Sequence, residues 1–587
     1  MCGTDRSFRT DNIARLRRLR AADVVVLGGG VNGVAVLRDL ALNGVRAVLL
    51  DQRDFCAGAS SASTRMAHGG LRYLENREFR LVAESTRERN LLLKNAPHQT
   101  VPLQVVVPLE SYAGGLTGSV LNFLGVLRRR ARLSAFALAL ALMLYEFLGR
   151  VNRVLPRPAI ALSRSKLPDW LASRYKAMAC YFDARIRNPE ALILEMLEEA
   201  LSSQVDAVAL NYADWSNEAG GEFSITDSVT GESFSLRTKV VVNATGAWAD
   251  RVNARLGLKT DYVTAVKGAH IVLRDDALRE RLEGRAFYFD DGSGRMVICC
   301  PLERTVLMGT TEIPVEDPAK VQVEKQEVDY LKMALARLVP DIAITDNQIV
   351  AATSGCRPLR KSGDREVNRA NRDHAVHTVF VRDQDFHVIS LAGGKWTTFR
   401  ALAEEVSDQV LAHLGRTRAV STRNRRYPGA ASMEDPGRSH EALARDCASA
   451  TGLPLKRVAL LVRRYGAIGA RVAAFCSQGE DRALEALPLY SEREIVWLIR
   501  SRGALLLDDI VLRRTQIALD GLASVEALRE IAALLARTLD RPKDWADGEV
   551  ARCLQIKAIC LRPPLSADTP SSNDSGPDGG TRSASFA

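Results

Sequence analysis

The clearest hydrophobic pattern near the start of the chain is an apolar run, a glycine-rich turn and an amphipathic segment. Residues 24–27 are four consecutive apolar residues, as in a short buried strand. Helical apolar spacing follows over 34–43, Gly44 interrupts it, and a second apolar run covers 47–50. This order predicts a strand–helix–strand (βαβ) unit of the usual length.

The rest of the chain predicts several further parts. Another apolar run, 240–242, comes much later, so we expect a second domain threaded through the one that contains the βαβ unit. Helical patterns dominate after about residue 435 and predict an all-helical C-terminal domain; they cover 457–464, 492–500, 510–519 and 525–539. The end of the chain is rich in Ser, Gly, Pro, Asp and Thr and is expected to be disordered. The predicted divisions are a basic N-terminal extension (1–21), the two interleaved domains (22–430), the helical domain (431–562) and the tail (563–587).

Residues 116–148 combine apolar and basic character. Arg128, Arg129, Arg130 and Arg132 separate the apolar runs 120–127 and 133–144. The second run is twelve residues long, whereas a spanning helix needs roughly 17–25. We consider two interpretations: an element that enters the interface of an anionic membrane, and an amphipathic or buried core helix.

Composition and charge narrow the class of protein. The chain has 587 residues, which is too long for a single hydrophobic core and predicts several domains. The hydrophobic fraction of 47% is typical of a globular protein. The net charge of +10 favours anionic partners, but no nucleic-acid-binding module accompanies it, so we expect no nucleic-acid partner. The ten cysteines include no Cys-x-x-Cys pair and are interpreted as buried thiols in a reducing compartment, with no metal site. The arginine-rich start leaves a transit peptide as an alternative.

The glycine-rich turn carries the first chemical signal. Gly28, Gly30 and Gly33 satisfy G-x-G-x-x-G between a predicted strand and a predicted helix, which is the context this motif requires. These glycines allow a tight turn, close approach of a pyrophosphate and close helix–strand packing. Asp51 ends the second strand, where an acid accepts hydrogen bonds from ribose hydroxyls. Together they predict a dinucleotide site.

Three further features favour FAD over NAD. Small hydroxyl residues that suit a pyrophosphate and a ribityl chain follow the βαβ unit, namely Ser60, Ser61 and Ser63. The run 240–242 leads into a small turn at Thr245 and Gly246. Gly393, Gly394 and Lys395 precede a predicted helix (397–411) whose amides could face a flavin. A second G-x-G-x-x-G for a separate NAD is absent from the sequence.

Several motifs, in order, resemble those of the FAD-dependent glycerol-3-phosphate dehydrogenases. They are His68–Glu75, Lys267–Val272, Gly309–Glu312, Ser354–Leu359, Asn371–His374 and Gly393–Thr398. The likeness covers roughly residues 22–410, and a weaker one continues through Tyr465-Gly466 and Arg513-Arg514-Thr515.

The resemblance implies an α/β fold with a Rossmann-like FAD-binding domain, an interleaved mixed α+β substrate domain and the helical C-terminal domain. It also implies oxidation of sn-glycerol 3-phosphate to dihydroxyacetone phosphate by hydride transfer to flavin N5. The electrons would then pass to a membrane quinone, from a cytoplasmic protein bound peripherally at the inner membrane. The oligomeric state stays open, with a homodimer as one expectation.

The same motifs contain the candidate site residues. Arginine forks and lysine suit a phosphorylated substrate, and the substrate-binding candidates are Arg72, Tyr73, Arg357, Arg372 and Lys395. The catalytic candidates are His68, His374, Lys395 and Arg357; each histidine could be the base or could only hold backbone in place. Gly69 and Gly70 join the cofactor-binding residues already named.

Three positions depart from the family pattern and concern the substrate. Asn188-Pro189-Glu190 stands where the family tends to have Asp-Ala-Arg, Ala247 replaces a proline, and Trp396 replaces a smaller apolar residue. Two alternatives therefore remain beside the dehydrogenase. One is an FAD-dependent oxidase or dehydrogenase of another hydroxy or amino acid, and the other is a flavin-binding, membrane-associated protein without turnover.

Overall fold

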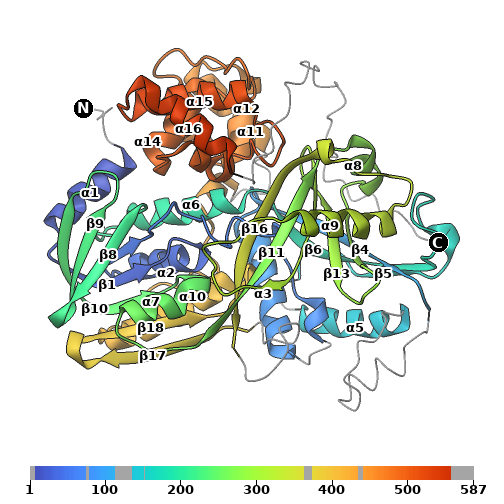
Figure 1. Cartoon of the computed structure of the whole chain (residues 1–587), viewed down its shortest axis with the longest axis horizontal. Coiled ribbons are helices and arrows are strands. Elements are labelled where there is room, and N and C mark those ends of the chain that lie inside the picture. Colours follow the sequence, from blue (N-terminus) through green and yellow to red (C-terminus); the bar gives the residue numbers. More distant parts are fainter. Residues whose placement is uncertain are drawn as a thin grey trace.

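Two β-sheets and a group of C-terminal helices organise the chain (Figure 1). The computed structural model describes residues 7–74, 78–112, 135–150, 153–361, 373–433 and 440–556. Three parts of the predictions lie outside the described residues: the four arginines of the basic segment (Arg128, Arg129, Arg130 and Arg132), Arg372, and the tail 563–587.

The first sheet is mostly parallel and contains the predicted βαβ unit. Its strands lie in the order β17 (Ala375–Val381), β18 (Phe386–Ala392), β10 (Ser233–Asn243), β1 (Ala21–Leu27), β2 (Ala47–Leu50) and β7 (Val208–Leu210). An antiparallel extension, β8 (Ala213–Glu218) and β9 (Glu222–Asp227), pairs with β10. Val24 pairs with Val240 on one side and with Ala47 on the other, so the late apolar run becomes the central neighbour of β1.

Different elements cover the two faces of this sheet. On one face α2 (Val31–Leu42), α6 (Pro189–Leu201) and α10 (Phe399–His413) bury their apolar sides against β1, β2 and β10. On the other face lie α1 (Phe8–Arg18), the β8–β9 hairpin and α7 (Ala249–Arg255). Within the predicted N-terminal extension, α1 buries Ile13 and Leu16, and its Arg9 forms an ion pair with Asp227.

The second sheet is mostly antiparallel and is assembled from segments between the strands of the first. Its order is β15 (Ile313–Pro314), β11 (Val263–Leu273), β14 (Val306–Gly309), β13 (Met296–Pro301), β12 (Ala286–Asp290), β4 (Thr100–Leu109), β6 (Ala177–Ile186) and β3 (Met66–Ala67). Two further strands join it, β16 (Ile349–Arg360) beside β11 and β5 (Ala159–Ala161) beside β6. The helices that pack around it are α3 (Phe79–Asn95), α5 (Ala135–Leu148), α8 (Asp276–Leu282) and α9 (Lys325–Leu338).

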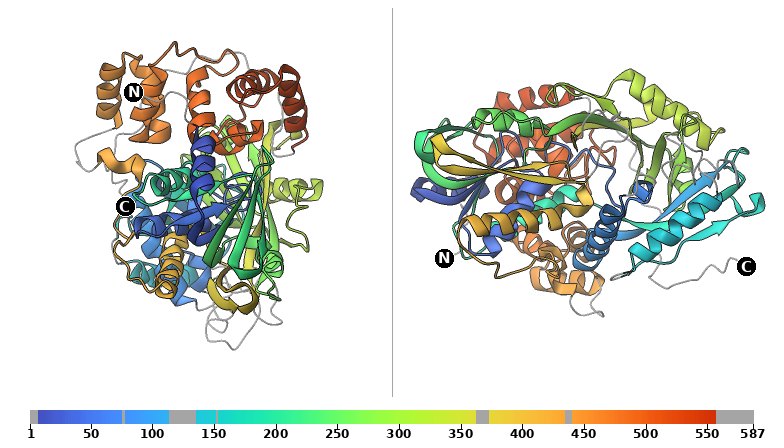
Figure 2. Two further views of the ribbon diagram at one scale, coloured as in Figure 1. Left: turned by 90° about the vertical axis from the view of Figure 1, so that its left-hand side faces the viewer. Right: turned by 90° about the horizontal axis from the view of Figure 1, so that it is seen from below.

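The C-terminal helices have a hydrophobic core of their own and lie as a layer beside the two sheets (Figure 2). They are α11 (His440–Thr451), α12 (Leu455–Tyr465), α13 (Ile468–Cys476), α14 (Glu492–Arg502), α15 (Val525–Thr538) and α16 (Lys543–Leu554). The expected helix over 510–519 is wrong. The chain instead makes a π-helical turn, η10 (Asp509–Arg514), and leaves it at Thr515 in an extended conformation, because both arginines of the turn point into a buried ion cluster. The predicted fold class is confirmed.

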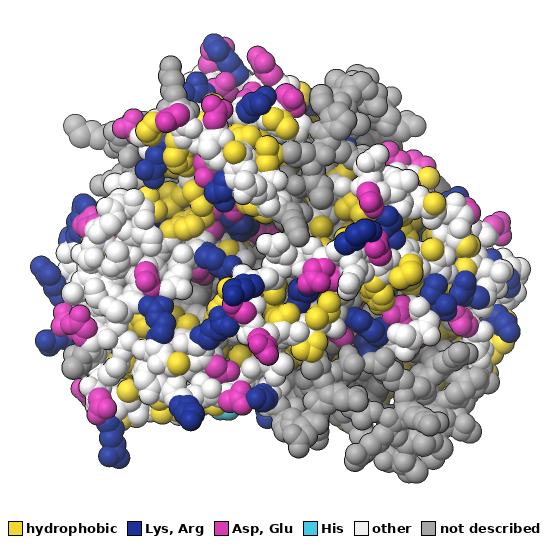
Figure 3. All heavy atoms as spheres, viewed as in Figure 1, with side chains coloured by type: hydrophobic (Ala, Val, Ile, Leu, Met, Phe, Trp, Pro, Cys, Tyr) yellow, Lys and Arg dark blue, Asp and Glu magenta, His cyan; other side chains and the backbone are white. Residues whose placement is uncertain are grey.

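The distribution of surface charge, the hydropathy of the helices and the state of the cysteines bear on the expectations from the sequence. On the face seen in Figure 3, acidic and basic side chains are interspersed, and they do not form one basic patch. None of the helices in the described ranges has the length and sustained hydropathy that crossing a bilayer requires. The eight cysteines in the described part of the chain are buried free thiols.

Candidate active site

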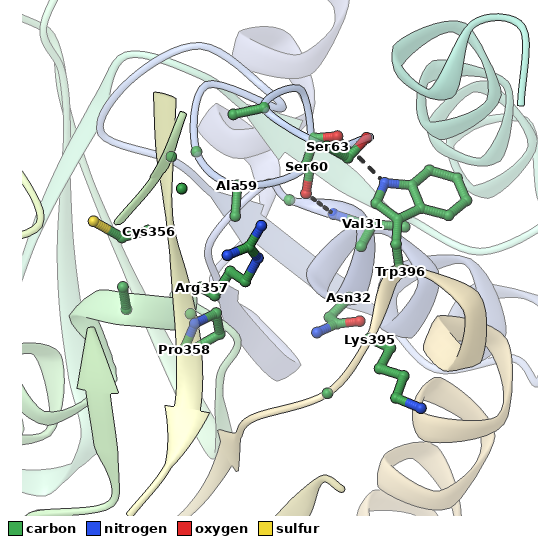
Figure 4. A pocket seen from close by; sticks show the side chains of 18 of the residues that line it. Val31, Asn32, Ala59, Ser60, Ser63, Cys356, Arg357, Pro358, Lys395 and Trp396 are labelled. Atoms are coloured by element: carbon green, nitrogen blue, oxygen red, sulfur yellow. Dashed lines mark hydrogen bonds between the residues drawn. The ribbon is translucent and has the colours of Figure 1, made fainter. Parts of the chain in front are cut away.

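A cavity of about 770 Å³ lies where the ends of the parallel strands meet the second sheet. Figure 4 shows Arg357 on β16 and Lys395 after β18 approaching it from different sides, with the start of α2 behind them. Most of the predicted site residues line this cavity: Gly28, Gly30, Asp51, Ser60, Ser63, His68, Gly70, Arg72, Tyr73, Thr245, Gly246, Arg357, Gly393, Gly394 and Lys395. Segments far apart in the sequence therefore form one continuous site.

The glycine turn at one end has the geometry that the motif predicts. Gly28 has a φ of 104°, and a Cβ atom there would lie 2.7 Å from the carbonyl oxygen of Ala244. A Cβ atom on Gly33 would lie 1.9 Å from the carbonyl oxygen of Gly28, so only glycine lets α2 start this close to β1. Gly33 acts through this packing and is not among the lining residues.

The N-terminus of α2 points its free amides toward the cavity beside Gly30. The Val31 N–H already donates to Ser60 Oγ at 2.9 Å, which anchors the serine loop to the helix (Figure 4). A Cβ atom on Gly30 would meet only Ser60 Oγ, at 3.1 Å, and would otherwise face open space. A pyrophosphate therefore has both room and amide donors here.

Asp51 lies at the end of β2 with its carboxylate held by backbone. Its two oxygens accept hydrogen bonds from the N–H groups of Gly29 (2.7 Å) and Arg53 (2.8 Å). Burial raises the pKa of Asp51 to about 6, and these two bonds counter part of the rise. The group is ionised above that value and is oriented to accept hydrogen bonds from a ribose.

Three of the candidate cations, Arg72, Arg357 and Lys395, also line the cavity. Arg357 donates to Thr310 Oγ1 at 2.9 Å, while Glu312 lies 3.9 Å from it. The Nζ of Lys395 lies 3.6 Å from the centre of the Tyr73 ring and donates to Ser85 Oγ at 3.2 Å. Cations held in this way suit an anionic ligand.

The two candidate histidines have different surroundings. His68 lines the cavity, and its backbone N–H and C=O are both hydrogen-bonded to the Thr397 hydroxyl. His374 is not among the lining residues and pairs with Glu405 through Nε2 at 2.8 Å. Burial lowers the pKa of His374, but the bond to Glu405 and neighbouring carboxylates outweigh this and raise it above its usual value. Of the remaining candidates, Ser61 and Gly69 lie beside the lining residues, and Arg372 is outside the described part.

One buried histidine lies behind the cavity-lining residues, and the sequence analysis did not select it as a candidate. His270 on β11 is fully buried, and its Nε2 lies 2.9 Å from Thr64 Oγ1. Burial and the charge of Arg357 lower its pKa to about 3, so the ring is neutral. The motif 267–272 contains His270, but the alternation of residues along a strand does not say which side chain will be buried beside Thr64 and Arg357.

Helix α5 reaches the site from the outside of the molecule. Its Tyr145 hydroxyl donates to Asp183 at 2.8 Å, and the same carboxylate oxygen accepts the Gly69 N–H at 3.0 Å. A Cβ atom on Gly69 would lie 2.1 Å from the Tyr145 hydroxyl oxygen. Gly69 is therefore required for the packing of α5 against the turn that carries His68 and Gly70.

The three departures from the family pattern have different structural consequences. Asn188 caps the N-terminus of α6 by accepting the Ala191 N–H, and Glu190 forms a buried ion pair with Arg65. None of the residues 188–190 is among the cavity-lining residues. Trp396 and Ala247 do line the cavity, and the indole N–H of Trp396 donates to the Ser60 carbonyl at 3.3 Å (Figure 4). Only these two could alter a ligand's space directly.

Comparison with known proteins agrees with this geometry. The family model described as "FAD dependent oxidoreductase" matches residues 23–409, and the model "C-terminal domain of alpha-glycerophosphate oxidase" matches 420–546. The chain belongs to the FAD-dependent oxidoreductase family. The predicted cofactor, FAD, is thereby confirmed.

Curated relatives and solved structures match most of the chain. A glycerol-3-phosphate dehydrogenase from Synechocystis is 30% identical over 529 residues, covering 85% of this chain and 89% of the relative. The aerobic glycerol-3-phosphate dehydrogenase of Bacillus subtilis is 28% identical and covers 69% of each chain. The structure of the Bacillus halodurans glycerol-3-phosphate dehydrogenase complexed with FAD is 22% identical, covers 96% of this chain and 99% of that one, and superposes with a TM-score of 0.72. At this identity the last match supports the fold alone.

The residues present fit FAD. The glycine cradle, the amides at the start of α2 and the partly buried Asp51 carboxylate would hold the pyrophosphate and ribose of the nucleotide half. The turns at Thr245–Gly246 and Gly393–Gly394 would border the remainder. The cavity volume lies in the upper part of the 300–1,000 Å³ range of ligand pockets, which suits a large cofactor together with a small substrate.

Substitution of Gly30 tests this assignment. Gly30→Val places a branched side chain where a pyrophosphate would lie, and the backbone there (φ −78°) accepts any residue. We expect a folded protein that retains no FAD. The measurement is the ratio of flavin to protein absorbance after desalting, with the melting temperature as the test of folding.

Gly548→Val provides the control, because Gly548 is exposed and a Cβ atom there meets nothing within 4 Å. It should retain flavin like the unaltered protein. If the Gly30→Val protein were yellow and fully loaded with flavin, the assignment of the glycine turn to the FAD site would be wrong.

Proposed function

We propose that this enzyme oxidises sn-glycerol 3-phosphate to dihydroxyacetone phosphate and passes the electrons to a membrane quinone. The observation that carries the proposal is that three cations, Arg72, Arg357 and Lys395, line the same cavity as the Gly393–Gly394 turn. An amino-acid or neutral substrate does not require this many cations, whereas a phosphate dianion does. The names of the two curated relatives point to the same substrate.

Arg357 and Lys395 have different tasks in this proposal. Arg357 is oriented by Thr310 and offers its guanidinium fork to phosphate oxygens. Lys395, held over the Tyr73 ring and bonded to Ser85, carries a point charge that lowers the energy of a developing alkoxide. Two carboxylates, Glu312 and Asp183, also line the cavity.

The oxidation removes a hydride from the carbon of the secondary hydroxyl and a proton from its oxygen. FAD, when bound, supplies the hydride acceptor at its N5. We propose that His68 is the base that accepts the hydroxyl proton, because it lines the cavity. His374 is hydrogen-bonded to Glu405 and is not among the lining residues. The Thr397 hydroxyl is hydrogen-bonded to the His68 backbone and so fixes the position of the backbone that carries the imidazole.

An anaerobic visible spectrum is the experiment that tests the substrate. Adding sn-glycerol 3-phosphate to the flavin-loaded protein should bleach the flavin bands, while glycerol without the phosphate should not. Flavin bands that persist with the phosphate and bleach with a hydroxy or amino acid would replace the substrate. Rapid reoxidation of the reduced flavin by O₂, with formation of peroxide, would show that the enzyme is an oxidase and not a dehydrogenase. If none of these compounds bleached the flavin, the alternative of a flavin-binding protein without turnover would be favoured.

Removing Arg357 tests phosphate recognition. Hydrogen bonds to charged groups contribute about 1.5–3 kcal/mol, so Arg357→Ala should lower kcat/KM about 10- to 100-fold, mainly through KM. Steady-state kinetics with an artificial electron acceptor measure this. Arg382→Ala, which removes an exposed arginine from the turn between β17 and β18, should leave the kinetics unchanged. Kinetics unaltered by Arg357→Ala would remove Arg357 from the site.

We further propose that α5 contacts an anionic membrane surface, where a quinone would be available. Its exposed stripe consists of Phe136, Leu140, Met143 and Phe147, which are between 56% and 63% exposed. The opposite side, with Leu138, Leu142 and Tyr145, is buried against the second sheet. The helix lies at the outer edge of the molecule (Figure 1), and the four arginines of the basic segment precede it in the sequence. An apolar stripe flanked by basic residues is typical of helices that lie in a membrane interface.

Vesicle sedimentation tests this contact. The unaltered protein should sediment with phosphatidylglycerol-containing vesicles, and the double variant Leu140→Glu/Met143→Glu should lose most of this binding, because two charges would enter the apolar interface. Met333→Glu is the control, since Met333 on α9 is 66% exposed but lies outside the stripe. Equal binding by all three proteins would exclude α5 as the contact.

A further inference from the structure

A buried ion cluster joins the C-terminal helices to the loop that follows Asp51. Asp54 is 1% exposed, and both its oxygens are bound by Arg514, each at 2.7 Å. Arg513 donates from Nε to the same carboxylate at 2.6 Å. Asn211, after β7, donates to it at 2.9 Å. The two arginines stand about 460 residues later in the sequence than their partner.

On its other side, the Asp54 loop is bonded directly to the glycine turn. The Cys56 N–H donates to the Gly29 carbonyl at 3.1 Å, and the Gly29 N–H donates to Asp51 at 2.7 Å. The Phe55 ring fills the space beside Gly29, where a Cβ atom would lie 2.6 Å from it. A shift of the loop 54–56 would therefore move both the turn and the carboxylate that hold the nucleotide.

The loop depends on the arginines for electrostatic reasons. Burial raises the pKa of Asp54, but the charges and hydrogen bonds of Arg514 and Arg513 outweigh it and bring the pKa to about 2. A carboxylate buried this deeply without these partners would have to move toward water or take up a proton.

The arginines are themselves fixed by the unusual backbone of η10. The π-helical turn presents two successive side chains to the same buried carboxylate, and Arg513 also pairs with Asp508 and Asp509. The Tyr212 hydroxyl donates to Asp509 at 2.7 Å, which ties the turn to the first sheet a second time. Such π turns are frequent at functional sites.

We propose that Arg513 and Arg514 are positioning residues for FAD: they hold Asp54, and through residues 54–56 they keep Gly29 and Asp51 in the arrangement that binds the nucleotide. The cavity-lining residues in the described part of the chain all precede position 397, so the C-terminal helices act without touching the ligand. The proposal concerns cofactor affinity and does not depend on which substrate is oxidised.

FAD affinity of the full-length protein tests this, measured by fluorescence titration after mild removal of the flavin. Asp54→Asn and Arg514→Gln should each raise the dissociation constant at least tenfold. The double variant should be little worse than either single one, because both remove the same interaction. Arg514→Lys keeps the charge but loses the bidentate contact, so it provides a milder variant whose dissociation constant should rise about threefold.

The control is Glu494→Gln, which weakens the ion cluster that an equally buried carboxylate forms with Arg457 and Arg464 inside the C-terminal helices. It should lower the melting temperature and leave FAD affinity unchanged. An unchanged dissociation constant in Asp54→Asn, Arg514→Gln or Arg514→Lys would overturn the proposal. An equal loss of affinity in Glu494→Gln would also overturn it, since general destabilisation would then explain the effect.

Discussion

The close approach of α2 to β1 is the constraint on which the rest of this structure depends. It is possible only because Gly33 has no side chain: a Cβ atom would lie 1.9 Å from the Gly28 carbonyl oxygen. This approach brings the free amides of the helix to the end of the parallel strands, beside Asp51 and the Thr245–Gly246 turn. Backbone donors and one oriented carboxylate then meet in a single place, which is the arrangement that a dinucleotide requires.

The second sheet adds what the nucleotide fold lacks. Its strand β16 brings Arg357 to the cavity, and the turn after β18 brings Lys395 to the same cavity. Both cations are partly withdrawn from water and have defined neighbours, Thr310 for the arginine and Tyr73 with Ser85 for the lysine. Charges held in this way discriminate between ligands better than solvated ones, because a ligand that leaves them unpaired forgoes strong hydrogen bonds.

Two parts of the chain that do not line the cavity reach it through buried polar contacts. Helix α5, with its apolar outer stripe, contacts the Gly69 turn through Tyr145 and Asp183. The C-terminal helices contact the nucleotide turn through Arg514 and Asp54. The Asp183 carboxylate accepts hydrogen bonds from both α5 and the Gly69 turn, whereas Asp54 is bound by the arginines and its loop reaches the glycine turn through the Cys56 N–H and the Gly29 carbonyl. A buried carboxylate thus joins the distant element to the site in both places.

The sequence by itself determined the local structure and the chemistry of the cofactor: the apolar periods of the βαβ unit, the glycine spacing with its acid, and the ordered motifs that place FAD. These signals are local, since the spacing of apolar residues and the absence of a side chain act within one turn or strand. Tertiary structure decided the rest. It paired His374 with Glu405, made Asn188–Glu190 a helix cap and a buried ion pair, placed neutral His270 beside Arg357, and turned the expected helix over 510–519 into η10. The physical reason is that each of these outcomes depends on charges and packing from segments distant in sequence, as with Asp54 and Arg514. A local sequence pattern does not determine which distant side chain will be buried next to a given residue.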